Sequence, residues 1–203
     1  MERILEVLDE LFPNPKCELE FNKDYELLIA VVLSAQTTDK RVNEVTNVLF
    51  DKYKTLEELS NADIDDISKI IKPIGTFNKK SKFIKEICKY LLERYNGIVP
   101  MTHKELEIIP GVGHKTANVV LGVLYNIPTF AVDTHVSRVS KRLNLVKPID
   151  DVEKIEKKLK RRVPKEKWTN THHQMVLFGR YYCKAVKPVC ETCKLKDICK
   201  KDY

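Results

Sequence analysis

Four cysteines near the C-terminus are spaced closely enough to hold one metal centre. The pattern C-x6-C-x2-C-x5-C places four thiols within 17 residues. Four thiolates gathered by one compact loop suit an iron–sulfur cluster, whereas structural zinc sites often use two C-x2-C pairs and this segment has one. The spacing favours iron–sulfur, keeps zinc as the rival, and disfavours a disulfide pair, which conflicts with an intracellular chain. The candidate ligands are Cys183, Cys190, Cys193 and Cys199.

Residues 106–122, LEIIPGVGHKTANVVLG, form the second candidate site, a glycine hairpin between two helices. Thr102 and Glu105 have the spacing of a capping box at the start of the first helix. Gly111 and Gly113 are expected to adopt positive φ angles in a tight turn. The amides of such a turn, together with the first amides of the next helix, can bind a phosphate without reading sequence.

Lys115 lies in the first turn of the helix that follows the hairpin. The field of a helix start disfavours a cation there, and Lys104 adds a nearby positive charge. Both effects favour the neutral amine, which can attack an electrophilic carbon and form a Schiff base. Alternatively, Lys115 is one more phosphate contact, and the residues alone leave both roles open.

Asp133 is a candidate catalytic carboxylate. It stands before a helical pattern in FAVDTHVSRVSKRL, residues 130–143, where its side chain is expected to cap the helix. A carboxylate at that position could also stabilise a developing sugar cation or transfer protons.

The remaining cysteines and three histidines are interpreted as structural. Cys17 and Cys88 stand apart from the cysteine-rich tail and are expected to be packing residues. His172 and His173 lack ligand spacing to the cysteines. His135 is expected to bond the backbone through a ring nitrogen.

Helices must position these residues, because apolar side chains recur at helical spacing along the chain. With 6 glycines and few alternating segments, strands are not expected. We therefore predict an all-α protein of about ten helices joined by short loops. The expected apolar faces are Ile4, Leu5, Leu8, Leu11 and Phe12 in the first helix, Ala117, Val120, Leu121 and Leu124 after the hairpin, and Val152, Ile155, Leu159 and Val163 near residue 155.

Charge is distributed unevenly along the 203 residues, whose formal net charge is +7. Residues 1–77 hold 9 Lys/Arg and 16 Asp/Glu, whereas residues 78–203 hold 27 and 13, a net charge of +14. The second part suits a polyanion. The longest apolar run, LLIAVVL, is far shorter than the ~20 residues of a membrane span. The amphipathic N-terminal segment does not resemble a signal peptide, so we predict an intracellular protein.

Together with LLIAVVLSAQTTDKRVN (27–43) and HHQMVLFGRYYC (172–183), these motifs resemble the endonuclease III family, the DNA glycosylases and AP lyases of the helix-hairpin-helix superfamily. The resemblance covers nearly the whole chain in the right order. It implies an all-α, two-lobed fold, with a helical barrel lobe at 20–129. The other lobe is discontinuous, comprises 1–19 and 130–203, and carries a 4Fe–4S loop at 183–199.

The resemblance also implies a function in base excision repair. Lys115 would attack C1′ of a flipped-out nucleotide, and Asp133 would assist. The enzyme would remove oxidised pyrimidines and cleave 3′ to abasic sites by β-elimination. One 4Fe–4S cluster would be held by the four cysteines, and damaged double-stranded DNA would be the partner. The DNA contacts implied are Gln36, Gly111, Val112, Gly113, His114, Lys184 and Lys187.

The sequence departs from the family pattern at two positions and leaves alternatives open. Thr76, in PIGTFNKKS (73–81), replaces a bulkier apolar wedge, and His114 stands where an arginine is common. A mismatch-specific adenine or thymine glycosylase is the nearest alternative, although Lys115 and the apolar Val31 argue against it. A non-catalytic helix-hairpin-helix DNA-binding protein and an electron carrier are more distant ones. We predict a cytoplasmic monomer with no membrane contact, associated with the nucleoid if the source is prokaryotic.

Overall fold

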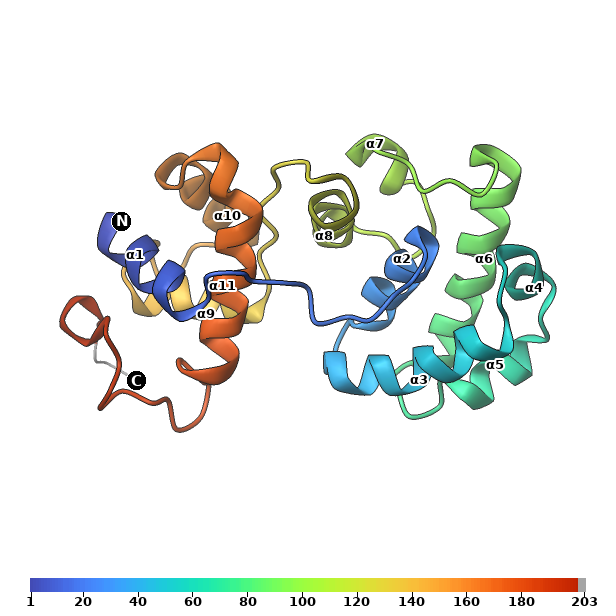
Figure 1. Cartoon of the computed structure of the whole chain (residues 1–203), viewed down its shortest axis with the longest axis horizontal. Helices are drawn as coiled ribbons and strands as arrows, with labels where there is room; N and C mark the ends of the chain where they lie inside the picture. Colours follow the sequence, from blue (N-terminus) through green and yellow to red (C-terminus); the bar gives the residue numbers. More distant parts are fainter. Residues whose placement is uncertain (201–203) are drawn as a thin grey trace. The chain divides into compact units, whose positions relative to one another are not determined.

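The computed structural model describes residues 1–200, and these form helices joined by loops, with no strand among them. The all-α prediction is confirmed. These residues form eleven α-helices and two short 3₁₀ helices, and Figure 1 shows how the α-helices are arranged within each part of the chain. Their bounds are α1 Glu2–Leu11, α2 Asp24–Leu33, α3 Asp39–Lys52, α4 Leu56–Asn61, α5 Ile64–Ile70, α6 Phe77–Tyr95, α7 His103–Leu106, α8 His114–Tyr125, α9 Thr134–Arg142, α10 Val152–Arg162, α11 Trp168–Tyr181, and the 3₁₀ helices Lys165–Lys167 and Lys196–Ile198.

The chain divides into two compact units. The first, called here the hairpin unit, is Cys17–Tyr125. The second, called the cysteine unit, joins Met1–Lys16 to Asn126–Tyr203. The N-terminal helix therefore folds with the C-terminal part of the chain, and it packs against α11. Lys115 belongs to the hairpin unit, and Asp133 belongs to the cysteine unit.

Helix α2 is the buried centre of the hairpin unit. Every residue from Tyr25 to Leu33 is buried, including Val31. A helix that is apolar on all sides is stable only when neighbours surround it, and α3, α6 and α8 pack against it. The hairpin of α7 and α8 is thus attached to the core through α8. No helix of residues 1–200 is long and apolar enough to cross a membrane.

The cysteine unit has its own core, built from α1, α9, α10 and α11. Phe130, Met175 and Phe178 are almost completely buried there. The expected faces of α1 and α10 contribute Ile4, Leu8, Ile155, Leu159 and Val163. Val152 was predicted to share the face of α10 but is 52% exposed. It is the first residue of α10, so it lies at the end of the helix rather than over the core.

Candidate active site and metal centre

The hairpin begins with a capped helix, as its sequence predicts. The Thr102 hydroxyl oxygen accepts the backbone N–H of Glu105 at 3.3 Å and donates to the Glu105 carboxylate at 2.6 Å. Two backbone bonds then fold the turn, from Ile109 to Leu106 and from Val112 to Ile109, each at 3.0 Å. Val112 is 6% exposed, so its side chain anchors the turn in the hairpin unit.

The two hairpin glycines are needed for different reasons. Gly111 has φ +82°, and a Cβ on it would lie 2.8 Å from the Phe83 ring. Gly113 was also expected to have a positive φ, and this prediction is wrong. Its carbonyl accepts the amide of Ala117 at 3.0 Å, so Gly113 already belongs to the start of α8, where φ is negative. A Cβ on Gly113 would meet nothing within 4 Å. The absence of a side chain at Gly113 therefore leaves the backbone accessible, so that a ligand can approach it closely.

Glu107 joins the two sides of the hairpin. Its Oε1 lies 2.9 Å from Nδ1 of His114 and 3.0 Å from Nδ1 of His103. The two imidazole rings stack, with centroids 4.8 Å apart. The hydrogen bonds from His114 and then His103 lower the pKa of the Glu107 carboxyl. The position where an arginine was expected is thus occupied by a histidine that contacts the preceding helix end.

Lys115 is the second residue of α8 and is exposed. Within the described part of the chain, no acceptor bonds its side-chain amine. The residue therefore projects from the first turn of α8, two residues after Gly113. A residue needed only for packing or for an internal ion pair would not be placed in this way.

Asp133 caps α9, as predicted. Its Oδ1 accepts the backbone N–H of Val136 at 2.7 Å, and its carbonyl accepts that of Ser137 at 2.9 Å. The preceding residues Phe130, Ala131 and Val132 are at most 4% exposed, so the segment that carries the carboxylate is fixed in the core. The side-chain contact to the helix start uses Oδ1.

The three structural histidines have different partners. His172 places Nδ1 2.7 Å from the Ala131 carbonyl oxygen. His135 was expected to bond the backbone, but its Nδ1 lies 3.1 Å from Nη2 of Arg138. The same Nη2 donates to the Gly179 carbonyl at 2.7 Å, so the guanidinium lies between His135 and the backbone of α11. Burial lowers the pKa of His173 to about 3, which keeps that ring neutral.

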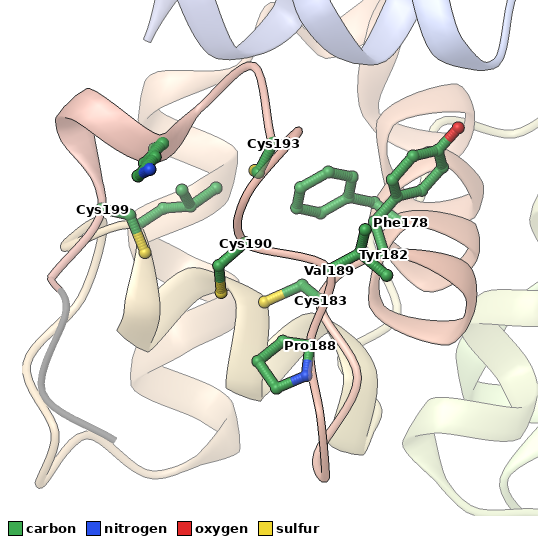
Figure 2. A pocket seen from close by; sticks show the side chains of 10 residues that line it. Phe178, Tyr182, Cys183, Pro188, Val189, Cys190, Cys193 and Cys199 are labelled. Carbon is green, nitrogen blue, oxygen red and sulfur yellow. The ribbon is translucent and has the colours of Figure 1, made fainter.

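The four tail cysteines line one cavity of about 220 Å³ (Figure 2). No disulfide is assigned to any of the four cysteines, so the structure does not support the disulfide alternative. Phe178, Tyr182 and Val189 supply apolar walls, and further lining residues are Leu143, Pro188 and Lys196. Thiols around a mostly apolar cavity are a donor set suited to a soft metal centre.

A cation and a set of backbone bonds hold the first cysteine in place. Arg142 Nη1 lies 3.4 Å from the Cys183 sulfur and donates to the Lys184 carbonyl at 2.7 Å. Arg138 Nε donates to the Cys183 carbonyl at 3.0 Å. Burial raises the pKa of the Cys193 thiol, and neighbouring thiols add to the effect. Positive charge from a guanidinium and from a bound metal would offset the negative charge of four thiolates. The residues therefore fit a metal cluster.

Lys184 and Lys187 are exposed on the loop between the first two cysteines. The loop is closed by the Val189 amide, which donates to the Tyr182 carbonyl at 2.9 Å. Lys187 has φ 51°, a left-handed conformation uncommon for a lysine. The loop thus presents two ammonium groups to solvent next to the cysteine cavity.

Two exposed loop residues of the hairpin unit have strained backbones. Gln36 and Thr76 both have φ 58° and lie in exposed positions. Gln36 follows the end of α2, and Thr76 precedes α6. Gln36 was predicted to contact DNA, and Thr76 was noted as replacing an apolar wedge. The sequence predicted neither these backbone conformations nor the burial of Lys80. Three lysines occur in the segment KKSK, 79–82, and the sequence does not indicate which of them is buried.

Comparison with known proteins places this geometry in a family. The model of the HhH-GPD superfamily of base excision DNA repair proteins matches residues 29–165, which defines the class of protein. Endonuclease III of Bacillus subtilis (strain 168) is 46% identical over 200 residues, which cover 98% of this chain and 91% of that protein. Endonuclease III of Escherichia coli (strain K12) is 44% identical over 196 residues, covering 97% and 92%.

Solved structures agree with this comparison. A non-covalent endonuclease III–DNA complex superimposes with a TM-score of 0.95 at 45% identity, covering 98% of this chain and 93% of that one. A trapped endonuclease III–DNA covalent intermediate gives 0.93 at 46% identity, covering 97% and 92%. A thermostable thymine-DNA glycosylase gives 0.82 at 25% identity, covering 98% and 95%.

Within the superfamily, this chain belongs to the endonuclease III family. The resemblance drawn from the hairpin, the Asp133 segment and the cysteine tail is thereby confirmed.

Proposed function

We infer that this protein is a DNA glycosylase and AP lyase of base excision repair. The observation that carries this conclusion is the exposed Lys115, which follows the Gly111 hairpin and has no bonded acceptor among the described residues. One similar structure is a trapped covalent intermediate between endonuclease III and DNA. A covalent intermediate requires a nucleophile, and Lys115 supplies an amine of the right kind.

Binding would begin at the phosphate backbone. The amides of the hairpin from Gly111 to His114 and the start of α8 suit a phosphate, and the open face of Gly113 permits close approach. Lys184 and Lys187 add positive charge from the cysteine unit. These contacts carry no sequence information, so recognition of damage would come from the nucleotide that is flipped out of the duplex. Gln36 would fill the gap that the nucleotide leaves.

Chemistry would start with attack by the Lys115 side-chain amine on C1′. The glycosidic bond between C1′ and the base breaks, and the base leaves with the bonding electrons and takes up a proton. The Asp133 carboxylate would stabilise positive charge on the sugar and accept a proton from the lysine nitrogen. The C1′–O4′ bond then breaks, O4′ leaves with the bonding electrons and takes up a proton, and the nitrogen lone pair forms a cationic Schiff base between Lys115 and C1′.

Strand cleavage follows from the Schiff base. The cationic imine acidifies the C2′ hydrogen, and removal of that proton expels the 3′ phosphate from C3′, which cuts the strand on the 3′ side of the lesion. Hydrolysis of the imine would then release Lys115 for a further cycle.

The four tail cysteines would hold one 4Fe–4S cluster with a structural role. When bound, the cluster would fix the loop 183–199 and with it the positions of Lys184 and Lys187. The four cysteines around one cavity and the guanidinium of Arg142 beside Cys183 support this assignment. The cytoplasmic location and the monomeric state stay predictions.

A nicking assay on defined duplexes tests the function. Substrates would carry thymine glycol, 5-hydroxycytosine, 8-oxoguanine, uracil opposite adenine, thymine opposite guanine, or an abasic site. We expect cleavage of the two oxidised pyrimidines and the abasic site. Preferential action on thymine opposite guanine would instead support a mismatch glycosylase, and no cleavage of any substrate would support a DNA-binding protein without chemistry.

A further inference from the structure

Lys80, in the first turn of α6, is a buried cation of the hairpin unit that the proposed chemistry does not use. Its side chain is 4% exposed. The ammonium group donates to the carbonyls of Leu33 at 2.9 Å and Ala35 at 2.7 Å, and lies 3.3 Å from the Thr37 hydroxyl. All of these acceptors are uncharged, and burial lowers the pKa of Lys80. A buried charge without a carboxylate partner is costly, so a compensating role is expected.

The acceptors of Lys80 surround Gln36. Leu33 is the last residue of α2, where carbonyls carry partial negative charge that favours a cation. Ala35 and Thr37 are the two neighbours of Gln36 in the chain. The ammonium group therefore holds the Ala35 backbone on one side of Gln36 and the Thr37 side chain on the other. Gln36 itself has φ 58°, in the left-handed region. Such a conformation is strained for a residue other than glycine and persists only where surrounding contacts enforce it.

The backbone of Lys80 holds the second strained residue. Its amide donates to the Thr76 carbonyl at 3.0 Å, in the bond that starts α6. Thr76 also has φ 58°, and its hydroxyl donates to the Gly75 carbonyl at 2.6 Å. One residue thus bonds two loops that are separated by about forty positions in the chain.

We propose that Lys80 is a positioning residue that fixes the Gln36 loop and the Thr76 loop relative to each other, so that both enter the duplex together at the flipped nucleotide. The proposal rests on the proposed function for its consequence in DNA recognition. Its structural part concerns the free protein and can be tested without DNA.

The test compares Lys80→Met with Lys85→Met in the full-length holoprotein. Lys85 is a matched control, because it lies on the same helix and donates to a backbone carbonyl, that of Ala62 at 2.6 Å, away from both loops. Amide hydrogen exchange is measured on the free proteins. Lys80→Met should speed exchange about tenfold or more in residues 34–37 and 75–77, whereas Lys85→Met should leave these segments unchanged. Equal exchange in the loops of all three proteins would overturn the proposal.

A second readout measures discrimination. The dissociation constant is measured for a duplex with a tetrahydrofuran abasic analogue and for an undamaged duplex. Lys80→Met should reduce the ratio of the two affinities about tenfold, and Lys85→Met should not. An unchanged ratio in Lys80→Met would refute the recognition role. If the wild type itself showed no preference, the proposed function would fail, and exchange would still decide the role of Lys80. If Lys80→Met does not fold, Lys80→Gln, which keeps a donor, takes its place.

A different cluster, on the outside of the hairpin, has the composition of a metal site. His103, Glu107 and His114 offer two imidazole nitrogens and a carboxylate oxygen within 4.8 Å of one another. His103 begins α7, Glu107 ends it, and His114 begins α8. The side chains are 36%, 39% and 54% exposed, so solvent reaches the cluster. Two histidines and one glutamate form a frequent ligand set for zinc with an open position.

Zinc binding would draw the ligand atoms closer together, because they now lie within 4.8 Å of one another. Two ligand atoms on one tetrahedral zinc lie about 3.3 Å apart, and both imidazole nitrogens already lie 2.9–3.0 Å from Oε1 of Glu107. The geometry points to a surface site for zinc or a similar divalent transition metal across the two sides of the hairpin. Its open position would take water or a phosphate oxygen.

Equilibrium dialysis against zinc chloride tests this site, with zinc and iron counted per chain to confirm that the cysteine cluster is intact. The wild type should bind one zinc at a concentration of about 0.1 mM or below. The double substitution His103→Ala and His114→Ala should lose it, and Lys104→Ala, on the same helix, should keep it. No zinc on the wild type, or equal zinc on the double variant, would overturn the assignment.

Discussion

Gly111 lies against the ring of Phe83, and the backbone there has φ +82°, so a Cβ would come within 2.8 Å of the ring. The hairpin turn is therefore packed on α6 at a point that excludes a side chain. Gly113, two residues later, has open space on its Cα and a φ that other residues adopt. Substitutions at these two glycines can therefore test folding and the proposed phosphate contact separately.

The contrast predicts opposite effects for two alanine substitutions. Gly111→Ala should lower the free energy of unfolding by about 1–3 kcal/mol, from strain and from the clash with Phe83. Gly113→Ala should leave stability unchanged or slightly higher, yet weaken binding to undamaged duplex, because its methyl group would keep the backbone from a phosphate. Urea unfolding and fluorescence anisotropy measure the two effects. Equal DNA binding by Gly113→Ala and the wild type would contradict the hairpin as phosphate site.

The cysteine cavity predicts the metal content. Purified protein should be yellow-brown and contain about four irons per chain. Cys190→Ser should release iron and destabilise the cysteine unit, because metal binding and folding are coupled. Cys17→Ser, outside the cavity, is the control and should retain iron. Colourless protein with one zinc per chain would show that the four cysteines bind zinc and not an iron–sulfur cluster.

The exposed Lys184 and Lys187, on the loop between the first two tail cysteines, are predicted to affect the salt dependence of DNA binding. Each phosphate contact contributes about −0.9 to the slope of log K against log salt for duplex DNA. Lys184→Ala or Lys187→Ala should each make the slope shallower by about that amount and leave lesion preference unchanged. Anisotropy titrations at several salt concentrations measure the slope. If both variants keep the wild-type slope, the loop does not contact phosphate.

The neutral His173 predicts acid sensitivity. Its pKa is about 3 in the folded protein, and an unfolded histidine titrates near ~6.5. Between these values the unfolded state binds more protons, so the free energy of unfolding should fall as the pH falls, by up to about 1.4 kcal/mol per pH unit below ~6. His173→Gln should remove this contribution, so that the free energy of unfolding falls less between pH 7 and pH 5 than in the wild type. Parallel pH profiles for the two proteins, by urea unfolding, would contradict it.

Local patterns in the sequence predicted the helices and their caps well. Thr102 and Asp133 cap the helices where their spacing indicated, since a cap depends on residues within one turn. The φ of Gly113 could not be read in this way, because it depends on where α8 starts. The backbones of Gln36 and Thr76 depend on Lys80, whose side chain bonds a carbonyl 47 residues away. Long-range contacts of this kind leave no periodic signal.

The most direct measurement of the central claim is borohydride trapping of the Schiff base on an abasic-site duplex. Wild-type protein should form a permanent protein–DNA crosslink and nick the strand. Lys115→Gln should do neither and yet bind the duplex, because the hairpin amides remain. Lys104→Gln, a nearby exposed lysine on α7, should trap like the wild type. A crosslink that survives Lys115→Gln, with ordinary turnover at saturating DNA, would make Lys115 a phosphate contact and contradict the account.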